Sequence, residues 1–316
     1  MTIYGYSMSE PLVSAVIPAF NRPQVTQRAI DSVSAQIYQP IELVIVDDGS
    51  NPPLEKELSL QSDSIKDITV AHHDENRGAN VARNTGIDFS NGEYIAFLDS
   101  DDEWAPEKIQ RQIQRLEQKD SQSVSYTGVK NLDEEGNLNS IRNPTEDGDL
   151  LSELLCGNII GTFSSVMISS ETIEKVGRPN PDMPCWQDWE WYLRLATEVE
   201  FDVIEEALTI RHNGGDQISG SYTPKRDTAY PVILRQIKEL ASTSQEKRAG
   251  VAYLNYELAR AAQSNKHYSE ARQYYIRAIR HYPMESMFYI YLAFSGKHYP
   301  MARRLKRKVV RILSAI

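Results

Sequence analysis

Cysteine is scarce in this chain, which has only two among its 316 residues. Cys156 and Cys185 share no close spacing and form no metal-binding motif, so we expect packed or inert thiols of a reducing compartment. Long apolar segments are also lacking, since no run approaches the roughly 20 residues that a membrane-spanning helix needs. The polar N-terminal region lacks the basic stretch and apolar core of a signal peptide. These absences favour a cytoplasmic protein.

Two functional classes are excluded by what else is missing. The formal net charge of −10 argues against general nucleic-acid binding, which depends on a basic surface. The sequence contains no G-x-G-x-x-G segment, so a dehydrogenase with the dinucleotide-binding fingerprint is excluded. With 41% hydrophobic and 25% charged residues, the chain has the composition of an ordinary globular protein. Its length suits one large α/β domain and a smaller one.

The first hundred residues alternate apolar, β-rich runs with segments of helical spacing. We expect strands at Leu12–Ile17, Ile41–Asp47, Asp67–Ala71 and Tyr94–Leu98, and helices at Gln24–Gln36 and Asn76–Phe89. Strands that alternate with helices predict a mainly parallel sheet with helices on its faces. In such sheets ligands bind beyond the carboxyl ends of the strands. At those positions this chain has Pro18–Arg22, Asp47–Ser50 and Asp99–Asp102.

The later part of the chain changes from a mixed to a helical pattern. Strands are expected near Ser123–Val129, Thr162–Ile168 and Glu200–Ile210, with an aromatic-rich helix at Trp186–Thr197. From Arg226 onward the pattern is helical. We therefore predict an α/β domain at residues 1–225, with a Rossmann-like mixed sheet flanked by helices, and a small all-α region at residues 226–316.

An apolar strand runs straight into three aspartates, Asp99, Asp101 and Asp102. Carboxylates so close together repel one another and raise one another's pKa. A hard divalent cation such as Mg²⁺ or Mn²⁺ would stabilise this arrangement, because these ions take oxygen ligands and share them with the phosphates of a substrate. The alternative is an acidic turn whose last carboxylate caps a helix that starts near Pro106.

Four segments, in this order, resemble glycosyltransferase family 2, whose members have the GT-A fold. They are V-S-A-V-I-P-A-F-N-R at 13–22, E-L-V-I-V-D-D-G-S at 42–50, N-R-G-A-N-V-A-R-N-T-G at 76–86 and D-S-D at 99–101. Each motif alone is moderately specific, whereas all four at natural spacing are strongly so. The likeness covers roughly residues 11–215.

The resemblance implies which residues bind a nucleotide-sugar donor. These are Pro18, Ala19, Phe20, Arg22, Asp48, Arg77, Gly78, Arg83, Asp99 and Ser100. By the same resemblance Asp48 meets the base of the nucleotide, Asp99 faces the ribose and the metal, and Asp101 coordinates the metal directly. Plain alternatives stay open, because D-D-G-S is also a common turn sequence and Arg77 and Arg83 could lie on a solvated helix face.

A second group of functional residues is expected in C-W-Q-D-W-E-W at 185–191. The resemblance places the general base at Asp188, which would take the proton of an acceptor hydroxyl while the anomeric carbon inverts its configuration. Family members usually carry a second acid just before this aspartate, and this chain has Gln187 there. Help from a neighbouring carboxylate would therefore come from Glu190 or be absent. In the alternative interpretation Asp188 caps the following helix.

Three further residues have weaker functional interpretations. Trp186 and Trp189 could stack on an acceptor sugar, although aromatic residues at helical spacing more often pack in a core. His212 would be another metal ligand by the same resemblance, although a lone histidine is more often packed or at the surface. The glycine-rich segment Asn213–Thr223 that follows suits a mobile lid over the diphosphate and equally a linker.

The C-terminal region resembles one tetratricopeptide-like unit within Asn255–Pro283. The positions that match this repeat are Leu258, Ala259, Ala271, Tyr275, Ala278 and Pro283. Small residues at such positions let two antiparallel helices approach closely. Because solenoids need about three repeats to be stable, we expect the single copy to pack on the catalytic domain, in preference to forming a partner-binding array.

Residues 298–316 are predicted to form a basic amphipathic helix that lies on an anionic membrane surface. The chain from Lys297 onward has seven basic residues and no acidic ones. One helical face would carry Met301, Leu305, Val309, Ile312, Leu313 and Ile316. Basic amphipathic helices of this kind are interfacial. The alternative is that the apolar face packs on the preceding helices.

Together these observations predict an inverting, metal-dependent glycosyltransferase in the cytoplasm, peripheral at the inner face of the membrane. It would move a sugar from a nucleotide donor, UDP-linked by the family resemblance, to a glycan or lipid-linked acceptor in cell-surface polysaccharide synthesis. Two alternatives stay open: a sugar nucleotidyltransferase, and a helical-repeat interaction protein with an inactive transferase domain. The first normally has a glycine-rich phosphate loop where this chain has Pro18–Arg22. The second is disfavoured by the intact aspartates of the motifs.

Overall fold

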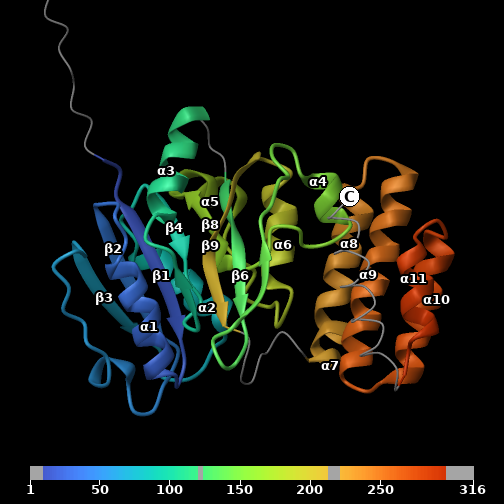
Figure 1. Ribbon diagram of the computed structural model, residues 1–316, viewed down its shortest axis with the longest axis horizontal. Helices are drawn as coiled ribbons and strands as arrows, with labels where there is room; N and C mark the ends of the chain where they lie inside the picture. The colour runs from blue at the N-terminus through green and yellow to red at the C-terminus, as the bar shows by residue number, and fades with distance from the viewer. Residues whose placement is uncertain (1–9, 120–123, 213–220, 297–316) are drawn as a thin grey trace, which may run out of the picture. The chain divides into compact units, whose positions relative to one another are not determined.

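A mixed sheet of nine strands organises the first part of the described chain (Figure 1). The structure is a computed structural model, which describes residues 10–119, 124–212 and 221–296. The strands are β1 Val13–Ala19, β2 Ile41–Asp47, β3 Asp67–His72, β4 Tyr94–Phe97, β5 Asp102–Trp104, β6 Val124–Leu132, β7 Leu138–Arg142, β8 Val166–Ser169 and β9 Phe201–His212. Their order across the sheet is β3-β2-β1-β4-β8-β6-β9-β5, and β7 pairs with β6.

The first half of the sheet is parallel, as the alternation of strands and helices predicts. β1 is parallel to both β2 and β4, and β2 is parallel to β3. The register places Ala19 beside Asp47, so β1 and β2 end together. β8 then runs antiparallel to β4 and β6, while β6 and β9 are parallel. The predicted fold class, a mixed α/β sheet flanked by helices, is thereby confirmed.

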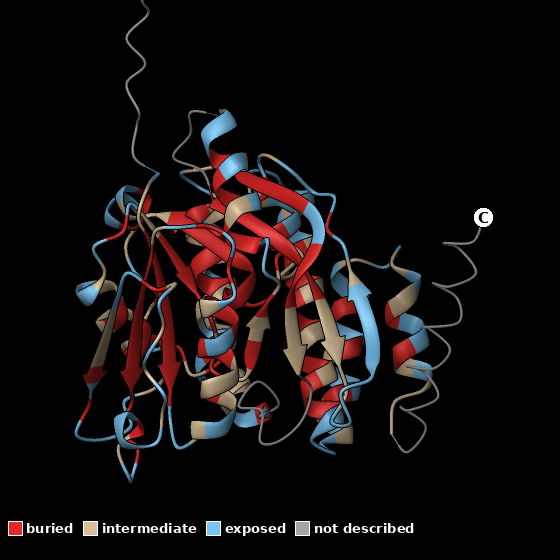
Figure 2. Cartoon of the chain, turned by 60° about the vertical axis from the view of Figure 1, so that its left-hand side comes forward, coloured by how far each residue is buried: buried red, intermediate tan, exposed pale blue. Residues whose placement is uncertain are grey.

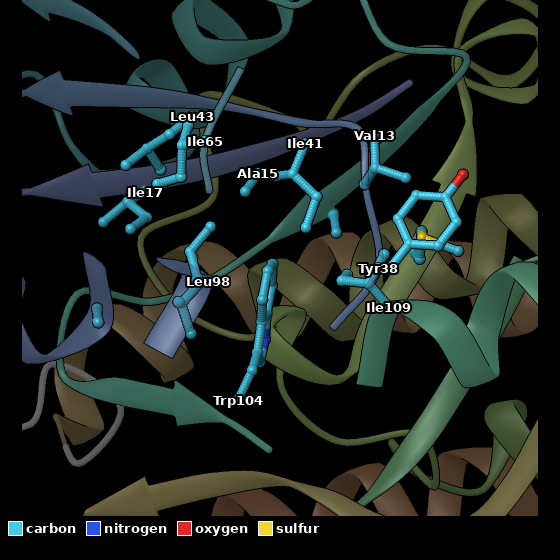
Figure 3. Packing of buried hydrophobic residues seen from close by; sticks show 14 of the residues in the cluster. Val13, Ala15, Ile17, Tyr38, Ile41, Leu43, Ile65, Leu98, Trp104 and Ile109 are labelled. Carbon is cyan, nitrogen blue, oxygen red and sulfur yellow. The ribbon is translucent and has the colours of Figure 1, made fainter. Parts of the chain in front are cut away.

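The core lies against strands that are apolar along their whole length. All residues of β1 and β2 are buried (Figure 2), which is typical of parallel strands covered on both faces. The covering helices are α1 Pro23–Ser34, α2 Ala79–Phe89, α3 Lys108–Lys119 and α5 Ser170–Val176, with a short turn of helix at Leu54–Lys56. One cluster packs Val13, Ala15, Ile17, Ile41 and Leu43 with Leu98, Trp104 and Ile109 (Figure 3).

Helix α2 lies very close to strand β1. A Cβ atom added at Gly86 of α2 would come within 2.2 Å of Cγ1 of Val16. Val16 is fully buried and points from β1 toward this helix. The absence of a side chain at residue 86 therefore sets how deep α2 sits on the sheet.

Two of the strands were not expected from the sequence. β5 has only three residues, and the side chains of β7 are mostly exposed. Neither segment has the alternation of apolar and polar residues that marks a half-buried strand. β5 is instead formed by antiparallel pairing with β9, in which Asp102 lies opposite Arg211. The acidic turn after β4 is therefore immediately followed by a strand, and α3 begins after that strand.

From Tyr222 to Ala293 the described chain is helical, as the sequence predicts. The elements are α7 Tyr222–Pro224, a π-helical turn at Lys225–Ala229, α8 Tyr230–Leu240, α9 Ser244–Ser264, α10 Tyr268–His281 and α11 Ser286–Ala293. Thr243 and Glu246 form a capping box that starts α9. The helices of this region enclose a tyrosine-rich hydrophobic cluster that includes Tyr256, Tyr275 and Tyr291.

The described residues divide into two compact units that are interleaved in the sequence. Of the described residues, the first unit contains 10–119, 124–150, 160–181 and 194–212, and the second contains 151–159, 182–193 and 221–296. Helix α4 Leu151–Leu155 and most of α6 Gln187–Leu195 thus belong with the C-terminal helices. The boundary at residue 225 and the tetratricopeptide-like assignment stay predictions. None of the described helices combines the length and apolar composition that a membrane crossing requires.

Candidate active site

Asp47, the last residue of β2, holds the turn that follows this strand. Its carboxylate accepts hydrogen bonds of 2.9 Å from the backbone N–H groups of Ser50 and Leu54, and lies 3.1 Å from Nδ1 of His72. Burial acts to raise the pKa of this carboxyl, but the hydrogen bonds outweigh burial and bring the pKa below its ordinary value. Asp47 is therefore an ionised residue with a structural role.

Asp48 is only 3% exposed, and its carboxylate binds the loop that leads into α2. Oδ1 accepts the N–H of Arg77 at 2.9 Å, Oδ2 accepts the N–H of Gly78 at 2.8 Å, and Nδ1 of His73 lies 2.7 Å from Oδ1. The N–H of Asp48 itself donates to the carbonyl of Ala19 at 2.8 Å. The residue predicted to meet a nucleotide base thus joins the ends of β1 and β2 to the start of α2.

The turn after β1 is fixed to the turn after β2. The N–H of Asn21 donates to Oγ of Ser50 at 2.8 Å. Asn21 has a positive φ of 50°, a conformation that asparagine adopts more readily than most residues. Pro18 and Ala19 end strand β1, and Phe20 after them is 38% exposed. The predicted donor-binding turn therefore presents an aromatic ring at the surface.

Asp99 lies just beyond β4 and is tied to α2 by Arg83. Nη2 of Arg83 donates to Oδ1 of Asp99 at 2.6 Å, and Nη1 donates to Oδ1 of Asn80 at 2.8 Å. The guanidinium also stacks on Phe163, 3.9 Å from the ring centroid. Arg83 is 4% exposed, so it does not lie on a solvated helix face. Oδ2 of Asp99 accepts a hydrogen bond of 3.1 Å from Thr162.

The next two acids of the turn differ in their surroundings. Burial and the charge of Asp99 raise the pKa of Asp101, whereas Arg22, whose Nη1 lies 3.1 Å from Oδ2 of Asp101, lowers it. Asp102 is 2% exposed, and burial together with Asp99 raises its pKa well above the ordinary value. Oγ of Ser164 donates to Asp102 at 2.6 Å and accepts the N–H of Asp99 at 3.0 Å. One serine therefore fixes both ends of the turn.

His212, at the end of β9, contacts a different acid. Its Nε2 lies 2.5 Å from Oε1 of Glu103, and Nε of Arg28 lies 3.1 Å from the same oxygen. Arg28 also donates to the backbone carbonyl of Asp101 at 2.9 Å. The structure thus brings His212 to the aspartate turn through Glu103 and Arg28, and its role as a metal ligand stays a prediction.

Asp99 and Asp101, with the buried Ser100 between them, have the chemistry that suits Mg²⁺ or Mn²⁺. Within residues 10–119, 124–212 and 221–296, no three histidine, cysteine, aspartate or glutamate side chains are placed to hold a metal ion together. Burial and the charge of Asp99 both raise the pKa of Asp101, so a cation would stabilise its ionised form. Two carboxylates fit a cation that completes its oxygen shell with water and diphosphate.

In the second unit, Asp188 is the second residue of α6 and is partly exposed. Its Oδ1 accepts the N–H of the following residue at 2.8 Å. The side chain of Gln187 donates to an earlier backbone carbonyl at 2.8 Å. Glu190 is 3% exposed, and its Oε1 accepts a hydrogen bond of 3.1 Å from Gln236 of α8. The carboxylate of Glu190 is therefore directed to α8 and buried.

The two predicted acceptor-stacking residues differ in exposure. Trp189 is 1% exposed, and its Nε1 donates to the carbonyl of Leu154 at 2.7 Å, so its ring belongs to the core of the second unit. The ring of Trp186 meets Trp189 edge-on, with centroids 5.5 Å apart and planes at 78°. Trp186 is partly exposed, whereas Trp189 is buried.

Three residues that fix the site were not found from the sequence. His73 contacts Asp48, while Thr162 and Ser164 contact the aspartate turn. They lie outside every motif, and serine or threonine hydroxyls are too common in sequences to be singled out. The short polar run T-F-S-S at 162–165 was the one available signal, and it was interpreted as the start of a strand.

Known proteins resemble this chain in sequence and in fold. The profile of glycosyl transferase family 2 matches residues 14–175, about half of the chain. An uncharacterized glycosyltransferase of Rickettsia felis is 36% identical over 205 residues, which are 61% of this chain and 33% of that relative. The putative teichuronic acid biosynthesis glycosyltransferase TuaG of Bacillus subtilis is 30% identical over 181 residues, which are 56% of this chain and 71% of TuaG.

A solved structure shares the fold over nearly the whole chain. The crystal structure of S. aureus TarS 1-349 in complex with UDP-GlcNAc has a TM-score of 0.59 to this chain. The match covers 94% of this chain and 91% of that chain at 17% sequence identity. At that identity the likeness concerns the arrangement of the backbone alone.

Proposed function

This chain belongs to glycosyltransferase family 2, and on that premise we propose that it transfers a sugar from a UDP-linked donor to a hydroxyl of a glycan or lipid-linked acceptor. The observation that carries the proposal is the turn Asp99–Asp102, held by Arg83, Thr162 and Ser164 at the carboxyl end of β4. The likeness to TarS, seen with UDP-GlcNAc, supports the choice of UDP. The relative TuaG, named for teichuronic acid biosynthesis, supports a polysaccharide product.

The donor would bind where β1, β2 and β4 end. Asp48 would accept an N–H of the base, since its carboxylate has about four lone-pair sites and Arg77, Gly78 and His73 occupy three of them. Phe20, exposed at the end of β1, offers a ring to the base or ribose. Arg77, two residues before the start of α2, is exposed and offers a positive charge.

The diphosphate would lie beside Asp99 and Asp101. These two carboxylates would hold Mg²⁺ or Mn²⁺, which when bound neutralises charge on the leaving diphosphate. His212, a further ligand in the family pattern, would join them only after leaving Glu103. Arg22, 3.1 Å from Asp101, is a second source of positive charge for the same group. Arg83 keeps Asp99 in one orientation through its hydrogen bond of 2.6 Å.

Asp188 would act as the general base in the second unit. The acceptor O–H bond breaks, its proton passes to the Asp188 carboxylate, and the oxygen attacks the anomeric carbon as the bond to diphosphate breaks. A single displacement of this kind inverts the anomeric configuration. The side chains of Gln187 and Glu190 each have a hydrogen-bond partner, the carbonyl of Met183 and the side chain of Gln236 respectively.

We also infer where the reaction takes place. The basic segment 298–316, which lies outside the described residues, would hold a cytoplasmic enzyme at an anionic inner membrane surface and bring it to a lipid-linked acceptor. The tetratricopeptide-like unit Asn255–Pro283 covers parts of α9 and α10, which pack on each other. Its role would be structural, because a single repeat makes no extended binding surface.

A donor-hydrolysis screen tests the proposed function. The purified full chain is incubated with UDP-, GDP- and dTDP-linked sugars, with Mg²⁺, Mn²⁺ or EDTA, and the released nucleoside diphosphate is measured. We expect release from a UDP-sugar that depends on the divalent cation. Formation of inorganic pyrophosphate from UTP and a sugar phosphate would indicate the nucleotidyltransferase alternative, and the absence of any turnover would indicate an inactive transferase domain.

Two variants assign the roles within that screen. Asp101→Ala should lose the dependence of UDP affinity on Mn²⁺, measured by calorimetry, because the diphosphate charge is then poorly neutralised. Asp188→Asn should keep the UDP affinity of the parent while turnover falls by about 10²–10⁴-fold, the usual effect of losing a general base. Unchanged metal dependence in the first variant, or parent turnover in the second, would remove the respective assignment.

A further inference from the structure

Two adjacent histidines at the end of β3 contact the two adjacent aspartates at the end of β2. The register places His72 beside Asp47, and the N–H of His73 donates to the carbonyl of Asp47 at 2.9 Å. Nδ1 of His72 lies 3.1 Å from the Asp47 carboxylate, and Nδ1 of His73 lies 2.7 Å from that of Asp48. Since successive side chains of a strand point to opposite faces of a sheet, the two pairs lie on different faces.

His73 is the buried histidine of the two, and both of its ring nitrogens have a partner. Its side chain is 7% exposed, whereas that of His72 is 43% exposed. Nε2 of His73 lies 2.9 Å from Oγ1 of Thr85, which belongs to helix α2. The imidazole is therefore held between Asp48 and α2, so its orientation toward Asp48 is set by a second contact.

The hydrogen between His73 and Asp48 is carried by the histidine. An ionised carboxylate has acceptor sites only, so Nδ1 donates to Oδ1 of Asp48. A threonine hydroxyl both donates and accepts, so Thr85 satisfies Nε2 whether or not this nitrogen carries a hydrogen. His73 is thus a hydrogen-bond donor to Asp48 that Thr85 keeps in place.

The two carboxylate oxygens of Asp48 are used to different extents. Oδ1 accepts the N–H of Arg77 at 2.9 Å and Nδ1–H of His73, which occupy both of its lone pairs. Within the part of the chain that the structure describes, Oδ2 accepts one hydrogen bond, from the N–H of Gly78 at 2.8 Å. An N–H group of a ligand would therefore find its acceptor at Oδ2.

We propose that His73 is a positioning residue for base recognition: by occupying Oδ1 of Asp48, it directs Oδ2 to the ring N–H of uracil. The inference rests on the proposed function, in which Asp48 meets the base of a UDP-linked donor. Uracil has a hydrogen on N3 where cytosine has a lone pair. A carboxylate oxygen fixed at that place accepts from uracil and is left without a donor by cytosine. His73 acts through Asp48 and takes no part in the transfer step.

The test uses two amide substitutions that separate the ring nitrogens of His73. In His73→Asn the amide nitrogen can take the place of Nδ1, and in His73→Gln it can take the place of Nε2. The affinities of the full chain and of each variant for UDP and for CDP are measured by calorimetry. Because UDP and CDP have the same ribose and diphosphate, the ratio of the two affinities reports the contact with the base alone.

The parent should bind UDP at least about tenfold more tightly than CDP. His73→Gln should reduce this ratio by about 3–10-fold, the loss expected for one hydrogen bond, whereas His73→Asn should keep the ratio of the parent. His72→Gln, at the exposed neighbour, is the matched control and should also keep it. A merely structural role of His73 would weaken both affinities together and leave the ratio unchanged.

A parent that binds UDP and CDP equally, or equal ratios in the two amide variants, would overturn the inference and leave the proposed transferase function standing. A second measurement needs no nucleotide. Nitrogen NMR of the histidine rings, assigned through His73→Asn, should show a hydrogen on Nδ1 of His73, and its absence would also overturn the inference. If Nδ1 carries the hydrogen but the parent binds neither diphosphate, the pairing of His73 with Asp48 stands and the proposed function fails.

Discussion

Asp47 and Asp48 are adjacent in the sequence and both buried, but their carboxylates bind different parts of the chain. Asp47 binds backbone N–H groups of its own turn, at Ser50 and Leu54. Asp48 binds backbone N–H groups of a loop that is distant in sequence, at Arg77 and Gly78. The first residue therefore shapes the turn, while the second connects that turn to the helix α2, which carries Arg83. The sequence D-D alone does not distinguish these two roles.

Asp47→Ala should destabilise the protein by about 2–6 kcal/mol at pH 7, because two buried N–H groups lose their acceptor at about 1–3 kcal/mol each. Urea unfolding measures the change. Asp67→Ala, at the exposed start of β3, is the control and should change stability by less than about 0.5 kcal/mol.

The effect of Asp47 should also depend on pH. A carboxyl whose pKa is lowered by folding stabilises the protein above its unfolded pKa, which is near the ordinary value of 3.8, and loses this effect as pH falls through the folded pKa. The difference in unfolding free energy between parent and Asp47→Ala should therefore shrink below about pH 4. A difference that stays constant down to pH 2 would show that the charge of Asp47 contributes nothing.

At the scale of secondary-structure elements, the depth at which α2 sits on β1 determines the reach of Arg83. Gly86 lies one turn after Arg83 on this helix, and its missing side chain permits the close approach to Val16. Arg83 can then donate to Asp99 at 2.6 Å while packed on Phe163. A change in helix packing on the strand should therefore be felt at the aspartate turn.

Gly86→Ala should destabilise the protein by about 1–3 kcal/mol, the usual cost of overpacking, although alanine is the better helix former by about 1 kcal/mol. Val16→Ala removes the methyl group that a new Cβ would meet. The double variant should therefore be more stable than the sum of the two single changes predicts, by at least about 0.5 kcal/mol. Thermal or urea unfolding of the four proteins gives the coupling, and strict additivity would contradict the packing argument.

The sequence predicted the elements whose burial is continuous and missed those that depend on a partner. β1 and β2 are mostly apolar and fully buried, so each can be recognised in the sequence as a continuous apolar segment. β5 exists through its pairing with β9, and pairing between distant segments leaves no local pattern. Ser164 could not be recognised from the sequence for the same reason, because its hydroxyl forms hydrogen bonds with Asp99 and Asp102 only after the chain has folded.

At the scale of the whole molecule, charge is concentrated at one end of an acidic chain. The net charge is −10, yet the chain from Lys297 onward has seven basic residues and no acidic one. Just before this segment, Met284 is 85% exposed and Tyr289 and Ile290 of α11 are also exposed. Basic residues near an anionic bilayer contribute about 1 kcal/mol each, so the segment would suffice to hold the protein at a membrane.

Vesicle co-sedimentation tests this prediction with the full chain and a chain that ends at Tyr299. The full chain should pellet with vesicles that contain phosphatidylserine, and should be released by raised salt, because the attraction is electrostatic. The shorter chain should stay in the supernatant, and vesicles of phosphatidylcholine alone should bind neither protein. Equal pelleting of both chains, or binding that salt does not affect, would show that the segment has a structural role only.

The interleaving of the two units limits how a gene for this protein can recombine. The indole N–H of Trp189 in α6 donates a hydrogen bond to the carbonyl of Leu154 in α4. A Cβ atom added at Gly250 of α9 would lie 2.9 Å from the carbonyl oxygen of Leu155. The sequences of α4, α6 and α9 must therefore be compatible with one another. A crossover near residue 225 would join the helices of one parent to the α4 and α6 surfaces of another. Lineages are therefore expected to inherit the C-terminal helices together with α4 and α6, and to diversify by point substitution more than by exchange of whole segments.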